Sequence, residues 1–126
     1  VDDSIVRGTT SVKIVEMIRS AGAVEVHMRI ASPPTTHSCF YGVDTPMRDQ
    51  LLAAQHSVEQ MARIIGVDSL AFLTMDGLYR AMGLDGRIPD SPQYCDACFS
   101  GEYPITPTDQ SGNQPSPQLS FLTQLT

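Results

Sequence analysis

The sequence predicts an α/β fold in which parallel strands are flanked by helices. A loop, a helical pattern and a strand pattern follow one another in the first 30 residues. This order is typical of α/β units whose strands run parallel. A further helical stripe and a short apolar strand pattern follow between residues 45 and 73, and they repeat the arrangement.

The first helix is expected to begin at a hydroxyl cap and to end at a glycine. Thr9, Thr10 or Ser11 can act as the N-cap, and Gly22 supplies the C-terminal stop. Between them the apolar side chains recur at helical spacing: Val12, Val15, Ile18 and Ala21. Residues 24–30 (VEVHMRI) then alternate apolar and polar, which predicts a half-buried strand with His27 facing outward.

A second helix is expected after the stiff, proline-containing loop 32–38. Thr45 and Pro46 have the types expected of an N-cap and a first helical residue. One apolar stripe then runs to Gly66 through Leu51, Ala54, Val58, Met61 and Ile65. A short buried strand over 69–73 and a helix over 75–82 follow. The methionines at helical spacing, Met17, Met61 and Met82, are interpreted as core residues, and His56 as a surface residue.

Composition limits the function classes. The chain has 126 residues, 41% of them hydrophobic, with a net charge of −6 and a pI of about 4.7. Attraction of the whole chain to nucleic acid or to an anionic membrane is therefore not expected. No apolar run approaches the about 20 residues that span a bilayer. Three cysteines are an odd number, which favours a reducing, cytoplasmic setting over a disulfide framework. Because the chain begins at Val1, directly on a motif, we expect a fragment or a processed piece.

The opening stretch VDDSIVRGTTS has the residue types of a sugar-phosphate loop. Arg7, Gly8 and the hydroxyls of 9–11 precede a helix whose first N–H groups are unpaired, which suits a phosphate. Asp2 and Asp3 would repel a phosphate, but they suit vicinal sugar hydroxyls or Mg²⁺. The alternative is a capped surface helix preceded by two acidic residues, and spacing alone does not decide between the two. Asp44 can either help to cap the second helix or face the site.

The cysteines form a second candidate site. Cys95 and Cys98 are a C-x-x-C pair, and Cys39 lies far upstream. Two thiolates at this spacing can hold a metal ion or a cluster, but three cysteines leave such a site one ligand short. His37 could complete a zinc site, or the fourth ligand could lie upstream of Val1. The alternative is that Cys39 is only a small buried apolar residue.

Several blocks resemble a known family. VDDSIVRGTTS is similar to the ribose-phosphate loop of the type I phosphoribosyltransferases. Further blocks are similar, in order and spacing, to the C-terminal part of the glutamine phosphoribosylpyrophosphate amidotransferases. They are IASPP (30–34), CFYGVD (39–44), DSL (68–70) and YCDACFSGEYP (94–104). The resemblance implies a partial type I phosphoribosyltransferase fold, truncated at its N-terminus.

The resemblance also implies roles for individual residues. Asp2 and Asp3 would hold the ribose hydroxyls of phosphoribosyl pyrophosphate and place Mg²⁺. Ser4 would also contact the substrate, and the 5′-phosphate would be bound by Arg7, Gly8, Thr9, Thr10 and Ser11. Cys39, Cys95 and Cys98 resemble three of the four ligands of the [4Fe–4S] cluster found in one branch of the family, with the fourth upstream of Val1.

The implied organisation is a transferase portion over 1–88, a cysteine-bearing segment over 89–104 and a loosely ordered tail over 105–126. The implied reaction is the formation of phosphoribosylamine from phosphoribosyl pyrophosphate and glutamine-derived ammonia, the first committed step of purine biosynthesis. Purine nucleotides would act as feedback inhibitors, and the protein would be a homo-oligomer, a tetramer by resemblance. The chain alone is expected to be inactive. Two alternatives are a non-catalytic nucleotide-sensing module and a small zinc or iron–sulfur structural domain.

Overall fold

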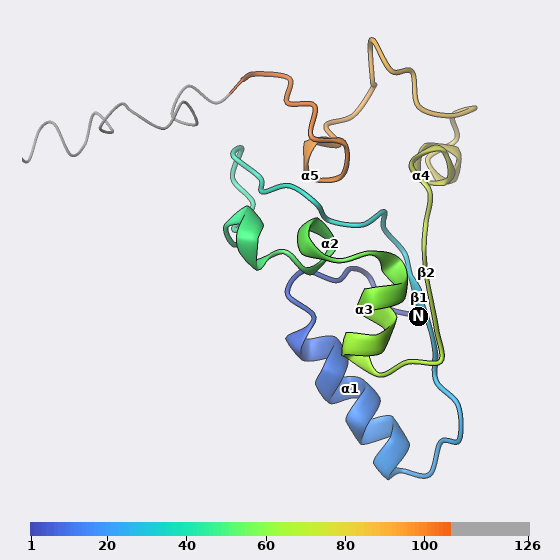
Figure 1. Ribbon diagram of the computed structural model, residues 1–126. Coiled ribbons are helices and arrows are strands. Elements are labelled where there is room, and N and C mark those ends of the chain that lie inside the picture. Colours follow the sequence, from blue (N-terminus) through green and yellow to red (C-terminus); the bar gives the residue numbers. More distant parts are fainter. Residues whose placement is uncertain (107–126) are drawn as a thin grey trace, which may run out of the picture.

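The computed structural model describes residues 1–106, so most of the predicted tail over 105–126 lies outside the described residues. Two parallel strands form its sheet: β1 (His27–Ile30) and β2 (Ser69–Phe72), with His27 opposite Ser69 and Ile30 opposite Phe72. Helices α1 (Thr9–Ser20) and α3 (Val58–Ile65) lie side by side on one face of the sheet (Figure 1). The predicted α/β fold with parallel strands and flanking helices is confirmed.

The opening segment lies beside the carboxyl end of β1. The N–H of Asp2 donates to the Arg29 carbonyl at 3.0 Å, and the N–H of Ala31 donates to the Asp2 carbonyl at 2.9 Å. Asp2 and Ile30 thus form an isolated parallel bridge. Ligands of α/β proteins bind at the carboxyl ends of parallel strands, so this pairing brings the opening loop to the edge where a ligand site is expected.

The core lies between the helices and the strands. Apolar side chains from the opening loop, α1, β1 and α3 form it, and they include Ile5, Val15, Met28, Ile30, Met61 and Ile65. Burial of Met61 confirms one of the methionine predictions. Met17 and Met82 are 70% and 48% exposed, so the other two are wrong. Met17 lies on the solvent side of α1, and Met82 is the C-cap residue just after α4 (Met75–Ala81).

The predicted hydroxyl cap of the first helix is wrong. The N-cap is Gly8, at φ 86° and with no side-chain cap, and the helix begins at Thr9. A left-handed backbone there strongly favours glycine. A Cβ on Gly8 would also lie 2.8 Å from Cδ2 of Leu52. The chain therefore turns into the helix through a conformation and a close contact that glycine alone accommodates easily.

The predicted second helix is three separate elements. A 3₁₀ turn η1 (Arg48–Gln50) and a short helix α2 (Leu52–Gln55) precede α3, and Thr45 and Pro46 lie outside all three. The break occurs because Ser57 starts a new helix with a capping box: its hydroxyl accepts from the Gln60 N–H at 3.2 Å, and the Gln60 side chain accepts from the Ser57 N–H at 2.9 Å. The apolar stripe is nevertheless real, since Leu51, Met61 and Ile65 are buried.

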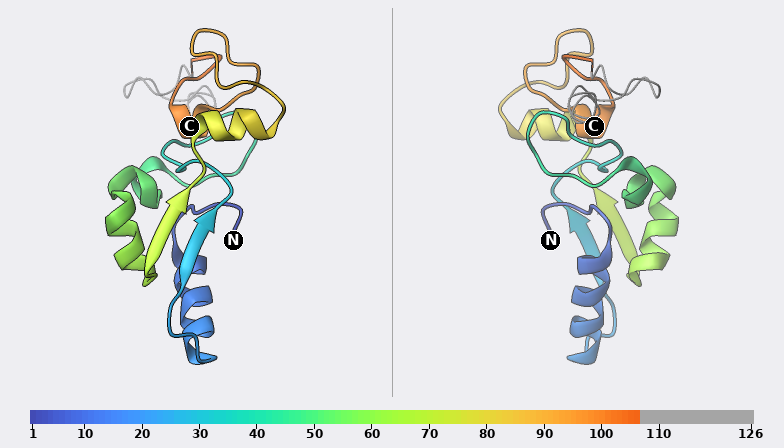
Figure 2. Two further views of the ribbon diagram at one scale, coloured as in Figure 1. Left: turned by 90° about the vertical axis from the view of Figure 1, so that its right-hand side faces the viewer. Right: turned by 90° about the vertical axis from the view of Figure 1, so that its left-hand side faces the viewer.

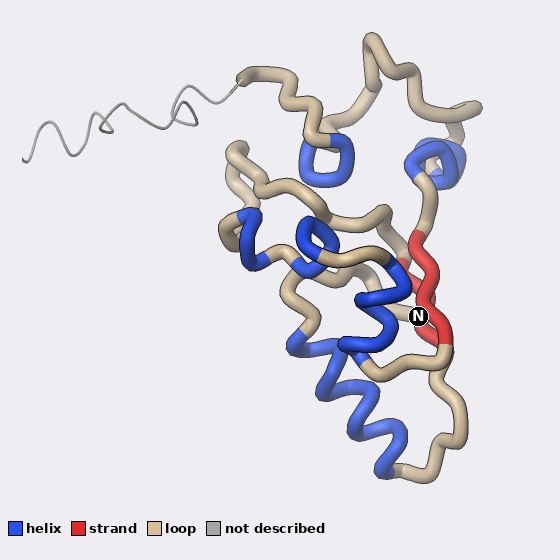
Figure 3. Tube along the Cα trace, in the orientation of Figure 1, coloured by secondary structure: helices blue, strands red, loops and turns tan. Residues whose placement is uncertain are grey.

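Beyond the carboxyl ends of the strands, the chain is mostly loop with two short helices (Figures 2 and 3). Helix α4 (Met75–Ala81) is capped by Thr74, whose hydroxyl accepts from the Gly77 N–H at 3.0 Å. Helix α5 (Ala97–Ser100) follows the first cysteine of the C-x-x-C pair. Within residues 1–106, no helix combines the length and apolar character needed to cross a membrane.

Candidate phosphoribosyl and cysteine sites

The opening loop lines a cavity of about 500 Å³, a size that accommodates a small organic ligand. Every residue from Asp2 to Ser11 contributes to its wall, and Ile14, Asp44 and Pro46 complete it. All eight residues predicted for phosphoribosyl pyrophosphate binding are therefore brought together. Asp44, left open between two roles by sequence, lies at this cavity and does not cap a helix.

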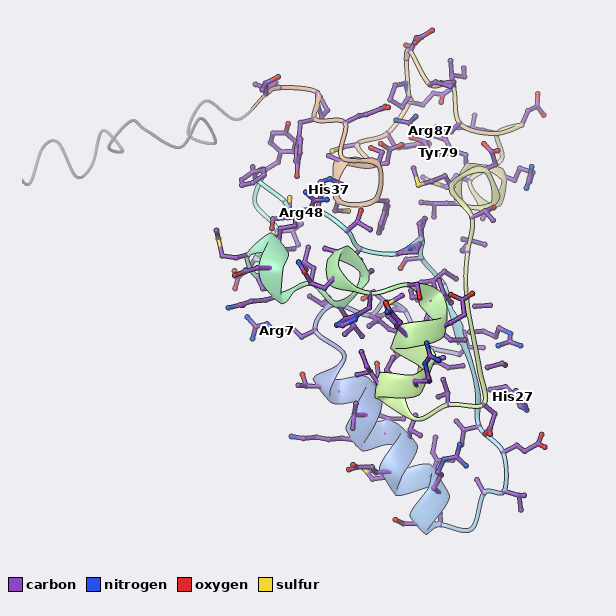
Figure 4. The ribbon with its side chains drawn as sticks, in the orientation of Figure 1. Arg7, His27, His37, Arg48, Tyr79 and Arg87 are labelled. Atoms are coloured by element: carbon purple, nitrogen blue, oxygen red, sulfur yellow. The ribbon has the colours of Figure 1, made fainter. Side chains whose placement is uncertain are left out.

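One side of the cavity is built to attract anions. The first intrahelical hydrogen bond of α1 runs from the Val12 N–H to the Gly8 carbonyl at 3.0 Å. The amides of residues 9–11 therefore take no part in the hydrogen bonding of the helix, and the helix dipole makes this end positive. Arg7 is exposed at the same end (Figure 4). Buried Ile5 anchors the loop, and the Leu52 N–H donates to the Val6 carbonyl at 2.9 Å.

The opposite side is acidic. The Asp2 carboxylate accepts from the Asp3 N–H at 2.9 Å, and the Asp3 carboxylate accepts from the Ser4 N–H at 2.6 Å. These local bonds hold both side chains at the start of the loop and leave acceptor capacity for a ligand. Asp44 adds a third carboxylate to the wall. The cavity thus has separate cationic and anionic ends.

The three cysteines line a second, largely apolar cavity of about 420 Å³. Long-range hydrogen bonds bring them together: the N–H groups of Thr36 and His37 donate to the Cys98 carbonyl at 3.0 and 3.1 Å. The Tyr103 hydroxyl donates to the Ser38 carbonyl at 2.7 Å. The loop before Cys39 is therefore fastened to α5 and to the segment after it, although some 60 residues separate them in sequence.

Electrostatics and geometry indicate what this cavity could hold. Burial raises the pKa of the Cys98 thiol, and the neighbouring Cys39 and Cys95 raise it further. Within residues 1–106, no three His, Cys, Asp or Glu side chains gather closely enough to hold a single metal ion. The three thiols line this cavity, and thiolates are ligands of zinc ions and of iron–sulfur clusters.

His37, the histidine proposed as a zinc ligand, is engaged elsewhere. Its Nδ1 lies 2.8 Å from the Thr36 hydroxyl, and its ring lies against Gly101, where a Cβ would come within 2.7 Å. Burial and the nearby Arg48 lower the pKa of its imidazole; Figure 4 shows these two side chains close together. The geometry gives no support to a zinc site completed by His37. His27 is exposed on β1, with Nε2 3.0 Å from the Glu25 carboxylate.

The two cavities share a wall. Ser4 and Val6 line both the cavity of the opening loop and that of the cysteines. The segment from Ser4 to Val6 thus borders both cavities.

Sequence reasoning missed a buried ion pair beside the cysteines. Asp96, 3% exposed, accepts from Arg87 Nε at 2.5 Å and from the hydroxyls of Tyr79 and Ser100, each at 2.8 Å. Burial opposes the ionisation of Asp96, but these hydrogen bonds outweigh it and lower the pKa of the carboxyl. No periodic pattern links these residues. The only sequence signal was a charged residue inside the C-x-x-C pair.

Comparison with known proteins defines the class. No family model matches the chain. Its structure superposes on glutamine phosphoribosylpyrophosphate amidotransferase from B. subtilis, solved with ADP and GMP, with a TM-score of 0.73, 50% identity, and coverage of 82% of this chain and 22% of that one. A second structure, of the allosteric regulatory enzyme of purine biosynthesis, matches with a TM-score of 0.71 and 50% identity, over 83% of this chain and 22% of that one. The chain is therefore an α/β protein with part of a phosphoribosyltransferase fold.

Proteins of similar sequence identify a narrower group of enzymes. Amidophosphoribosyltransferase of Rhizobium etli is 57% identical over 123 residues, which are 97% of this chain and 25% of the relative. The chloroplastic amidophosphoribosyltransferase 1 of Arabidopsis thaliana is 57% identical over 109 residues, 86% of this chain and 18% of the relative. The chain is homologous to a segment of the amidophosphoribosyltransferases, and it spans about a quarter or less of the length of these curated relatives.

Proposed function

We propose that this chain forms the ribose-phosphate part of an amidophosphoribosyltransferase, which makes phosphoribosylamine from phosphoribosyl pyrophosphate and ammonia released from glutamine. The observation that carries the proposal is the single cavity lined by every residue from Asp2 to Ser11, cationic at the helix end and acidic at the other. Homology to enzymes with this name supports the same assignment.

Each end of the cavity has a separate task in this proposal. The amides at the start of α1, with Arg7 and the hydroxyls of Thr9 and Thr10, bind the 5′-phosphate. Asp2 and Asp3 accept hydrogen bonds from the ribose 2′- and 3′-hydroxyls. Departure of pyrophosphate leaves positive charge on the ribose, which nearby carboxylates stabilise. Binding of the 5′-phosphate, far from the reacting ribose carbon C1, supplies energy that orients this carbon.

Mg²⁺ fits the acidic end of the site. Proteins typically bind this ion through one or two carboxylates together with substrate phosphates, so the pair Asp2 and Asp3 suffices without a third protein ligand. When bound, Mg²⁺ would neutralise charge on the departing pyrophosphate. We propose Asp2 and Asp3 as its protein ligands.

An iron–sulfur cluster fits the cysteine cavity. Three thiols surround an apolar space of about 420 Å³, and Cys39, Cys95 and Cys98 would supply three thiolate ligands. The cluster would link the loop after β1 to the C-x-x-C segment, and its role would be structural. Iron and acid-labile sulfide in protein purified without oxygen would support this part of the proposal, whereas zinc would contradict it.

Binding of phosphoribosyl pyrophosphate with Mg²⁺, measured by titration calorimetry on the full-length enzyme, tests the ribose-phosphate assignment. Replacing both Asp2 and Asp3 with Asn should weaken binding by about 100-fold, because charge-assisted hydrogen bonds and a metal contact are lost together. Asp85→Asn, an exposed acid outside the cavity, is the matched control and should bind as the wild type does. Equal affinity in all three proteins would overturn the assignment.

A further inference from the structure

Asp96, the first of the two residues between the cysteines of the C-x-x-C pair, is held in place by residues from elsewhere in the fold. Both carboxylate oxygens of Asp96 are used. Oδ2 accepts from Arg87 Nε at 2.5 Å and from the Tyr79 hydroxyl at 2.8 Å, and Oδ1 accepts from the Ser100 hydroxyl at 2.8 Å and from Arg87 Nη2 at 3.3 Å. Although Asp96 is the N-cap residue of α5, its side chain does not cap that helix. Its carboxylate is directed to other parts of the chain instead.

The partners of Asp96 are themselves fixed. Tyr79 on α4 is 1% exposed. Its hydroxyl also lies 3.1 Å from the carbonyl of Tyr94, the residue directly before Cys95. The Arg87 N–H donates to the Asp76 carboxylate of α4 at 3.0 Å, and the Arg87 guanidinium also pairs with Glu102. Figure 4 shows Arg87 and Tyr79 next to each other beside α4. The segment that carries both cysteines is therefore tied to α4 from one direction.

From the other direction the same segment is tied to the loop that carries Cys39. The Cys98 carbonyl accepts two N–H groups from that loop, and the Thr36 hydroxyl donates to the Phe99 carbonyl at 3.2 Å. The C-x-x-C backbone is thus fixed on both sides by contacts in which no thiol takes part. Removing one set of contacts would free the cysteines to turn relative to Cys39.

A buried carboxylate such as that of Asp96 is costly unless its charge is paired and hydrogen-bonded. The paired Arg87, with a side chain 12% exposed, neutralises it. A buried ion pair of this kind contributes little net stability, and its best attested role is to specify one arrangement.

We propose that Asp96 is a positioning residue, held by Arg87 and Tyr79, which directs the thiols of Cys95 and Cys98 toward the cavity before any cluster is present. The proposal rests on the proposed function only in identifying what the thiols later bind. The arrangement of the thiols themselves can be measured without metal.

The direct test measures how fast an uncharged maleimide labels Cys98 and Cys39 in the metal-free, reduced chain. Peptide mass spectrometry gives the two rates, and their ratio, Cys98 to Cys39, is compared between variants. Asp96→Asn should raise the Cys98 to Cys39 ratio by about tenfold, because local opening exposes the half-buried thiol. Tyr79→Phe keeps every charge and removes one donor, and it should raise the ratio by about threefold.

Met61→Ala is the matched control for general destabilisation. It creates a cavity in the core at α3, away from the cysteines, and should leave the ratio unchanged below its unfolding transition. An unchanged ratio in Asp96→Asn and Tyr79→Phe would overturn the proposal, as would an equal rise in Met61→Ala.

A second readout separates this inference from the proposed function. In the full-length enzyme purified without oxygen, iron and sulfide are assayed and the loss of visible absorbance in air is timed. If the wild type holds a cluster and Asp96→Asn loses it about tenfold faster, both ideas stand. If the wild type contains no iron and sulfide, the cluster proposal is wrong, and the labelling ratio alone decides the role of Asp96. If Asp96→Asn holds its cluster as long as the wild type does, the positioning role is wrong and the cluster proposal stands.

Discussion

A single polar side chain, that of Asp68, connects the ends of three secondary-structure elements by hydrogen bonds. Asp68, directly before β2, accepts from the Val26 N–H at 2.8 Å and from Arg19 Nη2 at 2.8 Å. Arg19 also donates to the Gly66 carbonyl at 2.9 Å. One carboxylate thus joins the end of α1 to the starts of both strands. The sequence block DSL resembles the family at this point, but no pattern in it shows that Asp68 has this structural task.

Asp68 gives a prediction about pH. The Val26 N–H, and then the Arg19 hydrogen bond, lower the pKa of the Asp68 carboxyl below its ordinary 3.8. A lowered pKa contributes stability that is present above the ordinary value and is lost as the pH falls through the folded value. Asp68→Asn should therefore reduce the free energy of unfolding in urea at pH 7, with the difference from the wild type shrinking as the pH falls below 3.8. Asp85→Asn should show no such difference, and a pH-independent effect of Asp68→Asn would contradict the assignment.

Helix starts are the element-scale feature on which the sites depend. The apolar spacing predicted α1, the stripe that includes α3, and β1, whose side chains alternate between exposed and buried. The strand predicted as buried at 69–73 is instead half-buried to exposed over β2. The apolar spacing did not predict where helices begin. Gly8 starts α1 through a left-handed backbone against Leu52, and Ser57 interrupts the apolar stripe with a capping box. The Ser-x-x-Gln spacing at 57–60 was available in the sequence, whereas the contact of Gly8 with Leu52 exists only in the fold.

Gly8→Ala tests the start of α1. The added methyl would lie 2.8 Å from a Leu52 methyl, and the residue would keep φ near 86° only under strain. We expect a loss of about 2 kcal/mol in the free energy of unfolding, measured by urea denaturation. Binding of phosphoribosyl pyrophosphate should weaken as well, because the amides at the start of α1 shift. Gly22→Ala also replaces a glycine of positive φ, but with nothing within 4 Å of the new Cβ. Gly22→Ala should bind phosphoribosyl pyrophosphate with the affinity of the wild type. An equal loss of affinity in Gly8→Ala and Gly22→Ala would contradict the role of the Gly8 contact.

At the scale of the whole molecule, two cavities meet along one segment. The opening loop borders both its own cavity and the cysteine cavity, through Ser4 and Val6. The phosphate-loop motif could be predicted from sequence, since its residues are contiguous, whereas Cys39 was joined to Cys95 and Cys98 only through the family resemblance. The assembly of the cysteine cavity could not be predicted, because it depends on hydrogen bonds between the loop at 36–38 and the segment 98–103. The buried pair of Arg87 and Asp96 was missed because no periodic pattern marks it.

The central claim is that the opening loop binds phosphoribosyl pyrophosphate for transfer to ammonia. The most direct measurement is the rate of ammonia-dependent pyrophosphate release by the full-length enzyme, together with its glutaminase rate. Replacing Asp2 and Asp3 with Asn should lower the ammonia-dependent rate by about 100-fold or more, while glutamine hydrolysis persists. An ammonia-dependent rate equal to that of the wild type would contradict the claim.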